Sequence, residues 1–327
     1  MTGSVPVRRS VLALAATMLA CLPAAAQGWP QRSITLIVSQ AAGASPDVMA
    51  RLMADSMAKS LGQGVVIENK PGGGNVIGAA AAARAAPDGY TLFLGGATIF
   101  CANKFLYGGS IPFDPIKDFT HLTRVSIGTT VLVVNAKEPW QTFAEFVAYA
   151  KANPGKIVMA SSGQGTISHL TLAKLMHSAG IEITHVPYRG LAPGLNDLLA
   201  GQVDMMFDNL GFSAQHVRAG KLKALAVGSE KRVASLPNVP TVAEAGLPGF
   251  DTSIWFGLNG PAGLPDAIRD QLAAAVAQTL KGEATLKSFR TSGIEPLTGG
   301  PAEYARFIGQ ETAKWADVVV KAGLVKP

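Results

Sequence analysis

Short apolar runs rich in β-branched residues alternate with alanine-rich stretches from about residue 30 onward. Residues 34–38 predict a buried strand, and residues 46–61 place apolar side chains near helical spacing. A second strand is expected at 65–67, a helix at 78–86 and a third strand at 90–94. This β-α-β-α-β order favours an open α/β sheet with parallel strands.

The same alternation begins again near residue 125. Strands are expected at 130–134, 157–160, 183–186, 205–207 and 222–227, with helices at 142–152, 167–179 and 193–200. A strand at 255–258 and helices at 265–280 and 301–322 follow, and we expect this last segment to pack on the first half of the chain. The sequence therefore predicts two α/β lobes, with residues 27–124 and 251–327 in lobe 1 and residues 125–250 in lobe 2.

The first 26 residues have a different character. Arg8 and Arg9 precede the apolar run 11–20, and Pro23 precedes the cleavage-type sequence 24–26 (Ala-Ala-Ala). This layout is typical of a secretory signal peptide, and the run is too short for a membrane span. We expect residues 1–26 to be removed near Ala26 and the mature protein to be periplasmic. The paired arginines leave both the Sec and the twin-arginine routes open.

Charge and cysteine content narrow the function further. The chain carries 28 Lys and Arg against 22 Asp and Glu, a net charge of +6 that falls to about +4 without Arg8 and Arg9. The basic residues form no run, so no nucleic-acid partner is expected, and a mildly basic surface suits anionic solutes. Cys21 belongs to the signal segment, which leaves Cys101 as an expected buried apolar residue.

Two loops share one construction. Residues 39–47 and 161–166 are rich in small side chains, and each leaves a predicted strand and opens a predicted helix. In the first loop, Ser45 is the expected N-cap, with Pro46 and Asp47 in the first turn. The amino end of a helix attracts anions, and ligands of open α/β sheets bind at the carboxyl ends of strands. One such loop per lobe predicts a clamp on a carboxylate; the alternative is that both are only tight turns.

Other chemistries find little support. In the segment 70–78 the last glycine comes one position too late for the dinucleotide pattern G-x-G-x-x-G, so no cofactor is expected. Ser162 and His169 form a serine–histidine pair without an identified acid, which keeps an exported serine hydrolase as an alternative. His169, His177 and His185 are spaced eight residues apart and lack metal-ligand spacing, so no metal is expected.

Several short segments, in this order and spacing, carry a resemblance to a known family. They include Trp29-Pro30-Gln31-Arg32, Val66-Ile67-Glu68-Asn69-Lys70-Pro71-Gly72, Ala86-Pro87-Asp88-Gly89-Tyr90, Pro112-Phe113-Asp114-Pro115, His185-Val186-Pro187-Tyr188-Arg189-Gly190, Phe207-Asp208-Asn209, Pro240-Thr241-Val242-Ala243-Glu244-Ala245-Gly246 and Trp255-Phe256-Gly257. With them the chain resembles the Bug (TctC-type) extracytoplasmic receptors of tripartite tricarboxylate transporters, over almost all of the mature sequence.

The resemblance implies a periplasmic-binding-protein fold of the Venus-flytrap, type II-like class, with two α/β lobes and a ligand cleft between them. It implies a monomeric, non-enzymatic receptor for a small carboxylate, such as a citrate-like acid, an acidic amino acid or an aromatic acid. The partner would be a two-component membrane permease with a large multi-span and a small four-span subunit. A role in sensing rather than uptake remains open.

The loop chemistry and the resemblance together give a set of expected ligand-binding residues. These are Gln40, Ala41, Gly43, Ser45, Asp47, Thr98, Ser162, Gly163, Gly165, Thr166, His169, Tyr188, Asp208 and Asn209. Gln40 stands where the family usually has an aromatic residue, and the loop around Thr98 and Phe100 also departs from the family pattern. We therefore expect the ligand to differ from the commonest ones of the family.

Overall fold

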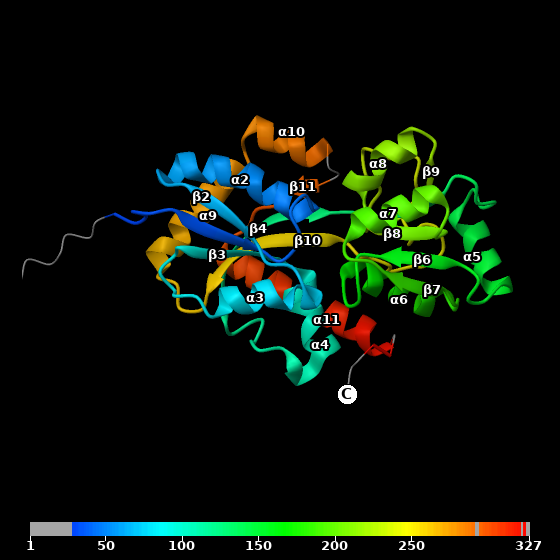
Figure 1. Ribbon diagram of the computed structural model, residues 1–327, viewed down its shortest axis with the longest axis horizontal. Coiled ribbons are helices and arrows are strands. Elements are labelled where there is room, and N and C mark those ends of the chain that lie inside the picture. The colour runs from blue at the N-terminus through cyan, green and yellow to red at the C-terminus, as the bar shows by residue number, and fades with distance from the viewer. Residues whose placement is uncertain (1–27, 292–293, 322, 325–327) are drawn as a thin grey trace, which may run out of the picture.

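The computed structural model describes residues 28–291, 294–321 and 323–324. The expected signal peptide and its cleavage site near Ala26 lie outside the described residues. The described chain forms two bodies, each built on one sheet with helices on its faces (Figure 1). Within these ranges, no helix combines the length and the apolar character that crossing a membrane requires.

The first sheet has the strand order β11-β4-β10-β3-β1-β2. Its parallel half is β1 (Ile34–Val38), β2 (Val65–Asn69) and β3 (Thr91–Gly96), which confirms the predicted parallel β-α-β-α-β unit. Its antiparallel half is β4 (Phe119–Gly128), β10 (Ile254–Pro261) and β11 (Ile294–Pro296). The sheet is therefore mixed, because the return of the chain through β10 reverses the strand direction next to β3.

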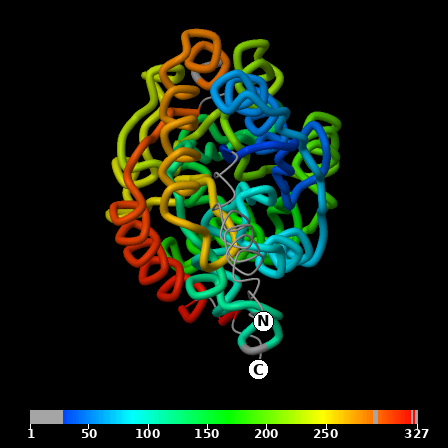
Figure 2. Tube along the Cα trace, turned by 90° about the vertical axis from the view of Figure 1, so that its left-hand side faces the viewer, coloured from blue at the N-terminus to red at the C-terminus, as the bar shows by residue number. Residues whose placement is uncertain are grey.

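Helices from both ends of the chain cover the first sheet. They are α2 (Ser45–Leu61), α3 (Val76–Ala83), α4 (Asn103–Tyr107), α9 (Asp266–Thr279), α10 (Glu283–Thr291) and α11 (Pro301–Lys321). Helix α9 packs against α2, and Figure 2 shows the orange and red C-terminal helices around the same body as the blue and cyan N-terminal elements. The C-terminal helices α9 and α10 therefore lie beside α2 from the N-terminal part of the chain.

The second sheet has the order β7-β6-β8-β5-β9. Its strands are β5 (Thr130–Asn135), β6 (Val158–Ser161), β7 (Thr184–Pro187), β8 (Met205–Asn209) and β9 (Leu222–Val227). Its helices are α5 (Phe143–Ala152), α6 (Ile167–Ala179), α7 (Leu191–Ala200) and α8 (Leu210–Arg218). β6, β7 and β8 are parallel, so their carboxyl ends lie at one edge of the sheet.

The chain crosses between the two sheets after β4 and again before β10. β4 stays in the first sheet as far as Gly128, and β5 enters the second sheet at Thr130. The crossing segments are tied together, since Thr252 N–H donates to Gly228 O at 2.7 Å and the Thr130 and Thr252 hydroxyls lie 2.8 Å apart. We propose that the lobes change near Gly128–Thr130 rather than at the expected boundary between residues 124 and 125.

Three local expectations need correction. The N-cap of α2 is Ala44 in an extended conformation, and Ser45 is the first helical residue without a capping hydrogen bond. α3 begins at Val76 and not at residue 78, because Asn75, with φ 75°, turns the chain directly into the helix. α8 was not anticipated, since its short sequence contains glycine and several polar residues.

Candidate functional site

A cleft of ≈ 1050 Å³ lies between the two bodies. Its walls come mainly from the segments that follow parallel strands: 38–46, 71–75 and 96–99 in the first lobe, and 162–168 (without Gly165), 189–193, 209 and 212 in the second. Ligands of α/β sheets bind outside the carboxyl ends of strands, so both sheets direct their binding edges into the same space. This places the two loops singled out in the sequence on opposite walls.

The first of these loops is held by a carboxylate. Asp47 is 2% exposed, and its Oδ2 accepts the N–H of Gly43 at 2.8 Å and the Arg51 Nε at 3.0 Å, while its Oδ1 accepts from Asn69 at 2.9 Å. Burial opposes ionisation of Asp47, but the hydrogen bonds from Arg51, Gly43 and Asn69 outweigh it and hold the pKa of Asp47 below its usual value. Asp47 therefore faces its own loop and does not line the cleft.

Hydroxyl groups hold the second loop. The Ser162 N–H donates to Ser168 Oγ at 2.9 Å, and the Gly163 N–H donates to Ser161 Oγ at 3.2 Å. The Thr166 hydroxyl donates to Gly163 O at 2.7 Å. These contacts use uncharged groups of the chain itself, so much of the hydrogen-bonding capacity of the loop backbone is already satisfied without a ligand.

Two stacked imidazoles lie behind this loop. His169 Nδ1 accepts the N–H of Gly165 at 3.1 Å, and its ring lies 4.3 Å from that of His185 at an interplanar angle of 9°. His185 Nε2 is 2.6 Å from Ser161 Oγ. Burial, together with the neighbouring His185, lowers the pKa of His169 to about 4, so its ring is neutral at neutral pH. His169 thus braces the loop from behind and does not line the cleft.

Three further expected residues are Tyr188 and Asp208, which lie outside the cleft lining, and Asn209, which lies in it. Tyr188 donates its hydroxyl to Asp197 Oδ2 at 2.6 Å, a bond that raises the pKa of Tyr188 to about 12. Asp208 is 0% exposed, its Oδ1 accepts the N–H of Asn209 at 2.7 Å, and burial raises the pKa of Asp208 to about 7. Both side chains lie behind the wall, whereas Asn209 is part of it.

The structure therefore brings most of the expected residues to one cleft. Those that line it are Gln40, Ala41, Gly43, Ser45, Thr98, Ser162, Gly163, Thr166 and Asn209. Those outside the lining are Asp47, Gly165, His169, Tyr188 and Asp208. Phe100, whose loop departs from the family pattern, is 1% exposed and packs edge-on against Phe119 in the core. Direct contact of any of these side chains with a ligand stays a prediction.

Sequence reasoning missed several wall residues, and Arg189 is the most important of them. It is exposed, lines the cleft beside the first residue of α7, and is the only charged side chain that the described part of the chain contributes to the lining. The segment 71–75, set aside as a failed dinucleotide motif, is also in the wall. Aromatic side chains, among them Tyr107, Phe212 and Phe256, also line it. The position of Arg189 shortly before a predicted helix was the signal that could have identified it.

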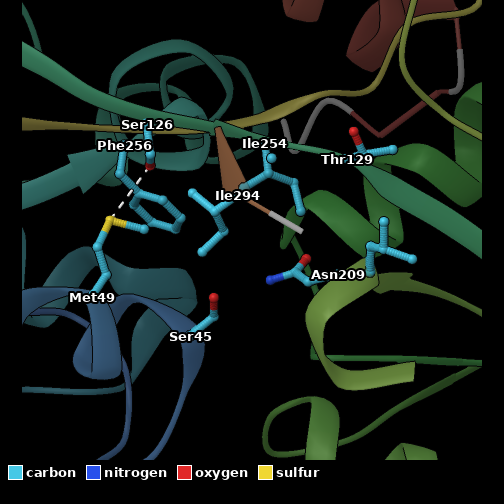
Figure 3. Close-up of a pocket in the computed structure, with 10 residues that line it drawn as sticks. Ser45, Met49, Ser126, Thr129, Asn209, Ile254, Phe256 and Ile294 are labelled. Atoms are coloured by element: carbon cyan, nitrogen blue, oxygen red, sulfur yellow. Dashed lines mark hydrogen bonds between the residues drawn. The ribbon is translucent and has the colours of Figure 1, made fainter. Parts of the chain in front are cut away.

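A second, small cavity of ≈ 20 Å³ lies where the lobes meet (Figure 3). Ser45 of α2 and Asn209 at the end of β8 reach it from opposite lobes, and the Ser126 hydroxyl contacts Met49 Sδ at 3.4 Å on its wall. A cavity of this size accommodates about one water molecule. Ser45 and Asn209 line both cavities, so the two lobes approach each other closely at this end of the cleft.

The remaining chemistry of the described residues is limited. Cys101 is buried and free, as expected, and burial raises the pKa of its thiol to about 12. Across residues 28–291, 294–321 and 323–324, no group of His, Cys, Asp and Glu side chains is arranged to hold a metal ion. Ser162 Oγ lies 3.0 Å from Ser168 Oγ, while His169 bonds to Gly165, so serine and histidine have different partners.

Comparison with known proteins decides the family. The model of the tripartite tricarboxylate transporter family receptor matches residues 49–324. The chain belongs to this receptor family. The protein BugT of Bordetella pertussis (strain Tohama I) is similar to it, with 36% identity over 301 residues that cover 92% of each chain.

Solved structures of the family have the same architecture. The periplasmic binding protein BugD has a TM-score of 0.85 and 35% identity, covering 91% of this chain and 100% of its own. R. palustris Rpa4515 with adipate gives 0.86 and 35% (91% and 99% covered), and MatC (Rpa3494) from Rhodopseudomonas palustris with bound malate gives 0.82 and 33% (89% and 100%). The receptor therefore has the expected two-lobed periplasmic-binding-protein fold and is a solute-binding protein.

Proposed function

We propose that this receptor captures a small carboxylate in the cleft between its lobes and delivers it to a two-component membrane permease. The observation that carries the proposal is the charge of the cleft wall. Among the described residues, Arg189 is its only charged side chain, and no Asp, Glu, Lys or His side chain lines it. An unpaired guanidinium in a cleft of otherwise neutral groups favours an anion, and its planar fork suits a carboxylate.

The similar structures support the same chemistry. Rpa4515 is described with adipate and MatC with malate, and both ligands are small carboxylates. The signal-like residues 1–26, with Arg8 and Arg9, support a periplasmic location after export. We propose a monomer that engages a permease with a large multi-span and a small four-span subunit, as family membership suggests.

A thermal-shift comparison of acids with their amides tests the proposal. We expect adipate, malate or a related carboxylate to raise the melting temperature of the exported protein, because a ligand at about 100 times its Kd stabilises by about 2.7 kcal/mol. The matching amides have similar size but no charge, and should raise it much less. Equal shifts in melting temperature with acids and amides would show that the receptor does not recognise the carboxylate of its ligand.

Two alternatives, a serine hydrolase and a sensing protein, can be tested separately. A hydrolase using Ser162 and His169 needs a hydrogen bond between them, but these side chains bond to Ser168 and Gly165, and His169 is buried. We expect no labelling of Ser162 by a serine-directed covalent inhibitor, and labelling would revive that alternative. A sensing role would use the same cleft. Uptake of the ligand that depends on the permease would indicate transport instead of sensing.

A further inference from the structure

The two walls of the cleft differ in their capacity to bind an anion. On the first wall, the amino end of α2 already has a carboxylate from the chain itself. Asp47 accepts the Gly43 N–H at 2.8 Å and is neutralised in turn by Arg51, whose Nη2 lies 3.0 Å from Asp47 Oδ1. A negative side chain in the first turn satisfies the helix dipole internally. The amino end of α3, which follows the wall segment 71–75, has no acidic residue in its first turn, so the described part of this wall offers an anion one helix end but no charged side chain.

The opposite wall is built without such a carboxylate. The helices α6, α7 and α8 begin there, and none of these three described helices has an acidic residue in its first turn. Arg189 precedes α7 by two positions, is exposed to the cleft, and forms no ion pair or hydrogen bond with any of the described residues. The positive charge of the cleft is thus concentrated on the second lobe, in one unpaired guanidinium.

Apolar and aromatic side chains occupy part of the remaining wall, beside hydroxyl and amide side chains such as Gln40, Thr98 and Asn209. Tyr107 and Phe256 belong to the first lobe, and Ile167, Leu191 and Phe212 belong to the second; all five are partly exposed and line the cleft. A carboxylate held between such side chains loses hydration without gaining a counter-ion, which is costly. An apolar group in the same place gains from burial. The cleft of ≈ 1050 Å³ leaves room for such a group.

We infer that Arg189 pairs with the single carboxylate of the ligand and that the ligand is a monoanion with an apolar body. This inference rests on the proposed function and narrows it from small carboxylates in general to alkyl or aryl monocarboxylates. The carboxylate lies against the second lobe, and the apolar body lies between Phe212 on that lobe and Tyr107 and Phe256 on the other. Arg189 is then the specificity-determining residue of the cleft.

Calorimetric titration with a matched pair of acids tests this. Hexanoate and adipate have the same chain length, but adipate carries a second carboxylate where hexanoate has a methyl group. We expect hexanoate to bind at least about tenfold more tightly than adipate, because Arg189 can pair with one carboxylate only, and the second carboxylate of adipate loses water without gaining a counter-ion. Hexanamide, which keeps the chain but has no charge, should bind more weakly than hexanoate.

Two variants locate the contacts. Arg189→Gln should weaken hexanoate binding about tenfold or more, because it removes the only charged partner among the described lining residues. The matched control is Arg218→Gln, which removes an exposed arginine at the end of α8 outside the cleft lining, and it should leave hexanoate affinity within about twofold. Phe212→Ala should weaken hexanoate more than acetate, which lacks the alkyl chain. Unliganded melting temperatures show that each variant is folded.

The outcomes separate this inference from the proposed function. If adipate binds as tightly as hexanoate, or if Arg189→Gln leaves hexanoate affinity unchanged, the inference is wrong. The proposed function survives either result as long as an acid binds better than its amide. If neither hexanoate nor adipate binds more tightly than hexanamide, the carboxylate receptor itself is wrong and the inference is lost with it.

Discussion

The loops 39–47 and 161–166 face each other across the cleft and share a strand-to-helix construction, yet different chemistry holds them in place. The first is fixed by a buried, ionised carboxylate, Asp47, with Arg51 as its counter-ion. The second is fixed by hydroxyls and by the neutral ring of His169. Two loops that look equivalent in sequence therefore present different electrostatic surfaces to a ligand.

This difference changes the predicted carboxylate clamp. The symmetrical version assumed that both helix ends offer their N–H groups to the ligand. The Gly43 N–H bonds to Asp47, and the Ser162, Gly163 and Gly165 N–H groups also have acceptors within the chain. Arg189, outside both loops, is the charged group left for an anion. Rigid loops with internally satisfied backbones suit a site whose shape is fixed before binding.

The largest expected effect on stability comes from removing Asp47, the carboxylate that holds the first loop. Asp47→Ala takes away the acceptor for Gly43, Arg51 and Asn69 and leaves a cavity at a 2% exposed position. Because hydrogen bonds to charged groups are among the strongest in proteins, we expect the free energy of unfolding to fall by about 3 kcal/mol, measured by urea denaturation.

Asp55→Ala is the matched control for Asp47→Ala. It removes a carboxylate from the exposed face of the same helix, α2, and should change the free energy of unfolding by less than about 0.5 kcal/mol. If the two substitutions cost the same, the first loop does not depend on Asp47, and the contrast between the loops disappears.

The stability of the second lobe should depend strongly on pH, because burial shifts the pKa values of two of its groups, His169 and Asp208. The folded-state pKa of His169 is about 4, below its ordinary 6.5, so its contribution to stability is lost as pH falls from 6.5 toward 4. The folded-state pKa of Asp208 is about 7, above its ordinary 3.8, so its contribution is lost as pH rises from 3.8 toward 7. The two contributions oppose each other in the natural protein.

Asp208→Asn separates these contributions. At pH 8 the variant no longer holds a buried charge, so we expect it to be more stable than the natural protein by about 2 kcal/mol. On acidification it keeps only the loss due to His169 and should lose stability more steeply. Urea denaturation at pH 8, 6.5 and 5 measures both effects. Parallel stability profiles for the two proteins would show that Asp208 is already solvated or ionised in the folded state.

Local patterns predicted most of the fold. The apolar runs at 34–38 and 222–227 coincide with β1 and β9, and the helix expected at 167–179 is α6. β4 was missed because adjacent polar residues, such as Thr120 and His121, interrupt it, so it has neither a continuous apolar run nor strict alternation. Its pairing with β10 joins residues that are between 126 (Gly128 and Ile254) and 142 (Phe119 and Pro261) positions apart, which no local pattern reveals.

The sequence predicted where the site lies better than it predicted what each of its residues does. The loop after each parallel strand could be placed at a ligand edge, because strand direction determines where such loops lie. The orientation of Asp47, His169 and Tyr188 away from the cleft could not be predicted from the sequence. It depends on partners such as Asn69 and Asp197, which come from other elements. Arg189 stands out only when the whole wall is assembled and its other described members are found to be uncharged.

The smallest effect concerns one glycine from each loop. Gly43 has φ +81° and open space where a Cβ would lie, whereas Gly163 has φ +131° and would place a Cβ 3.2 Å from Tyr188 O. Alanine strains the backbone at both positions, but only at Gly163 does it also meet a neighbouring segment of the chain. We expect Gly163→Ala to cost about 1 kcal/mol more than Gly43→Ala in urea denaturation. Equal costs would mean that the second loop is as free to adjust as the first, which would contradict a preformed wall around Ser162 and Thr166.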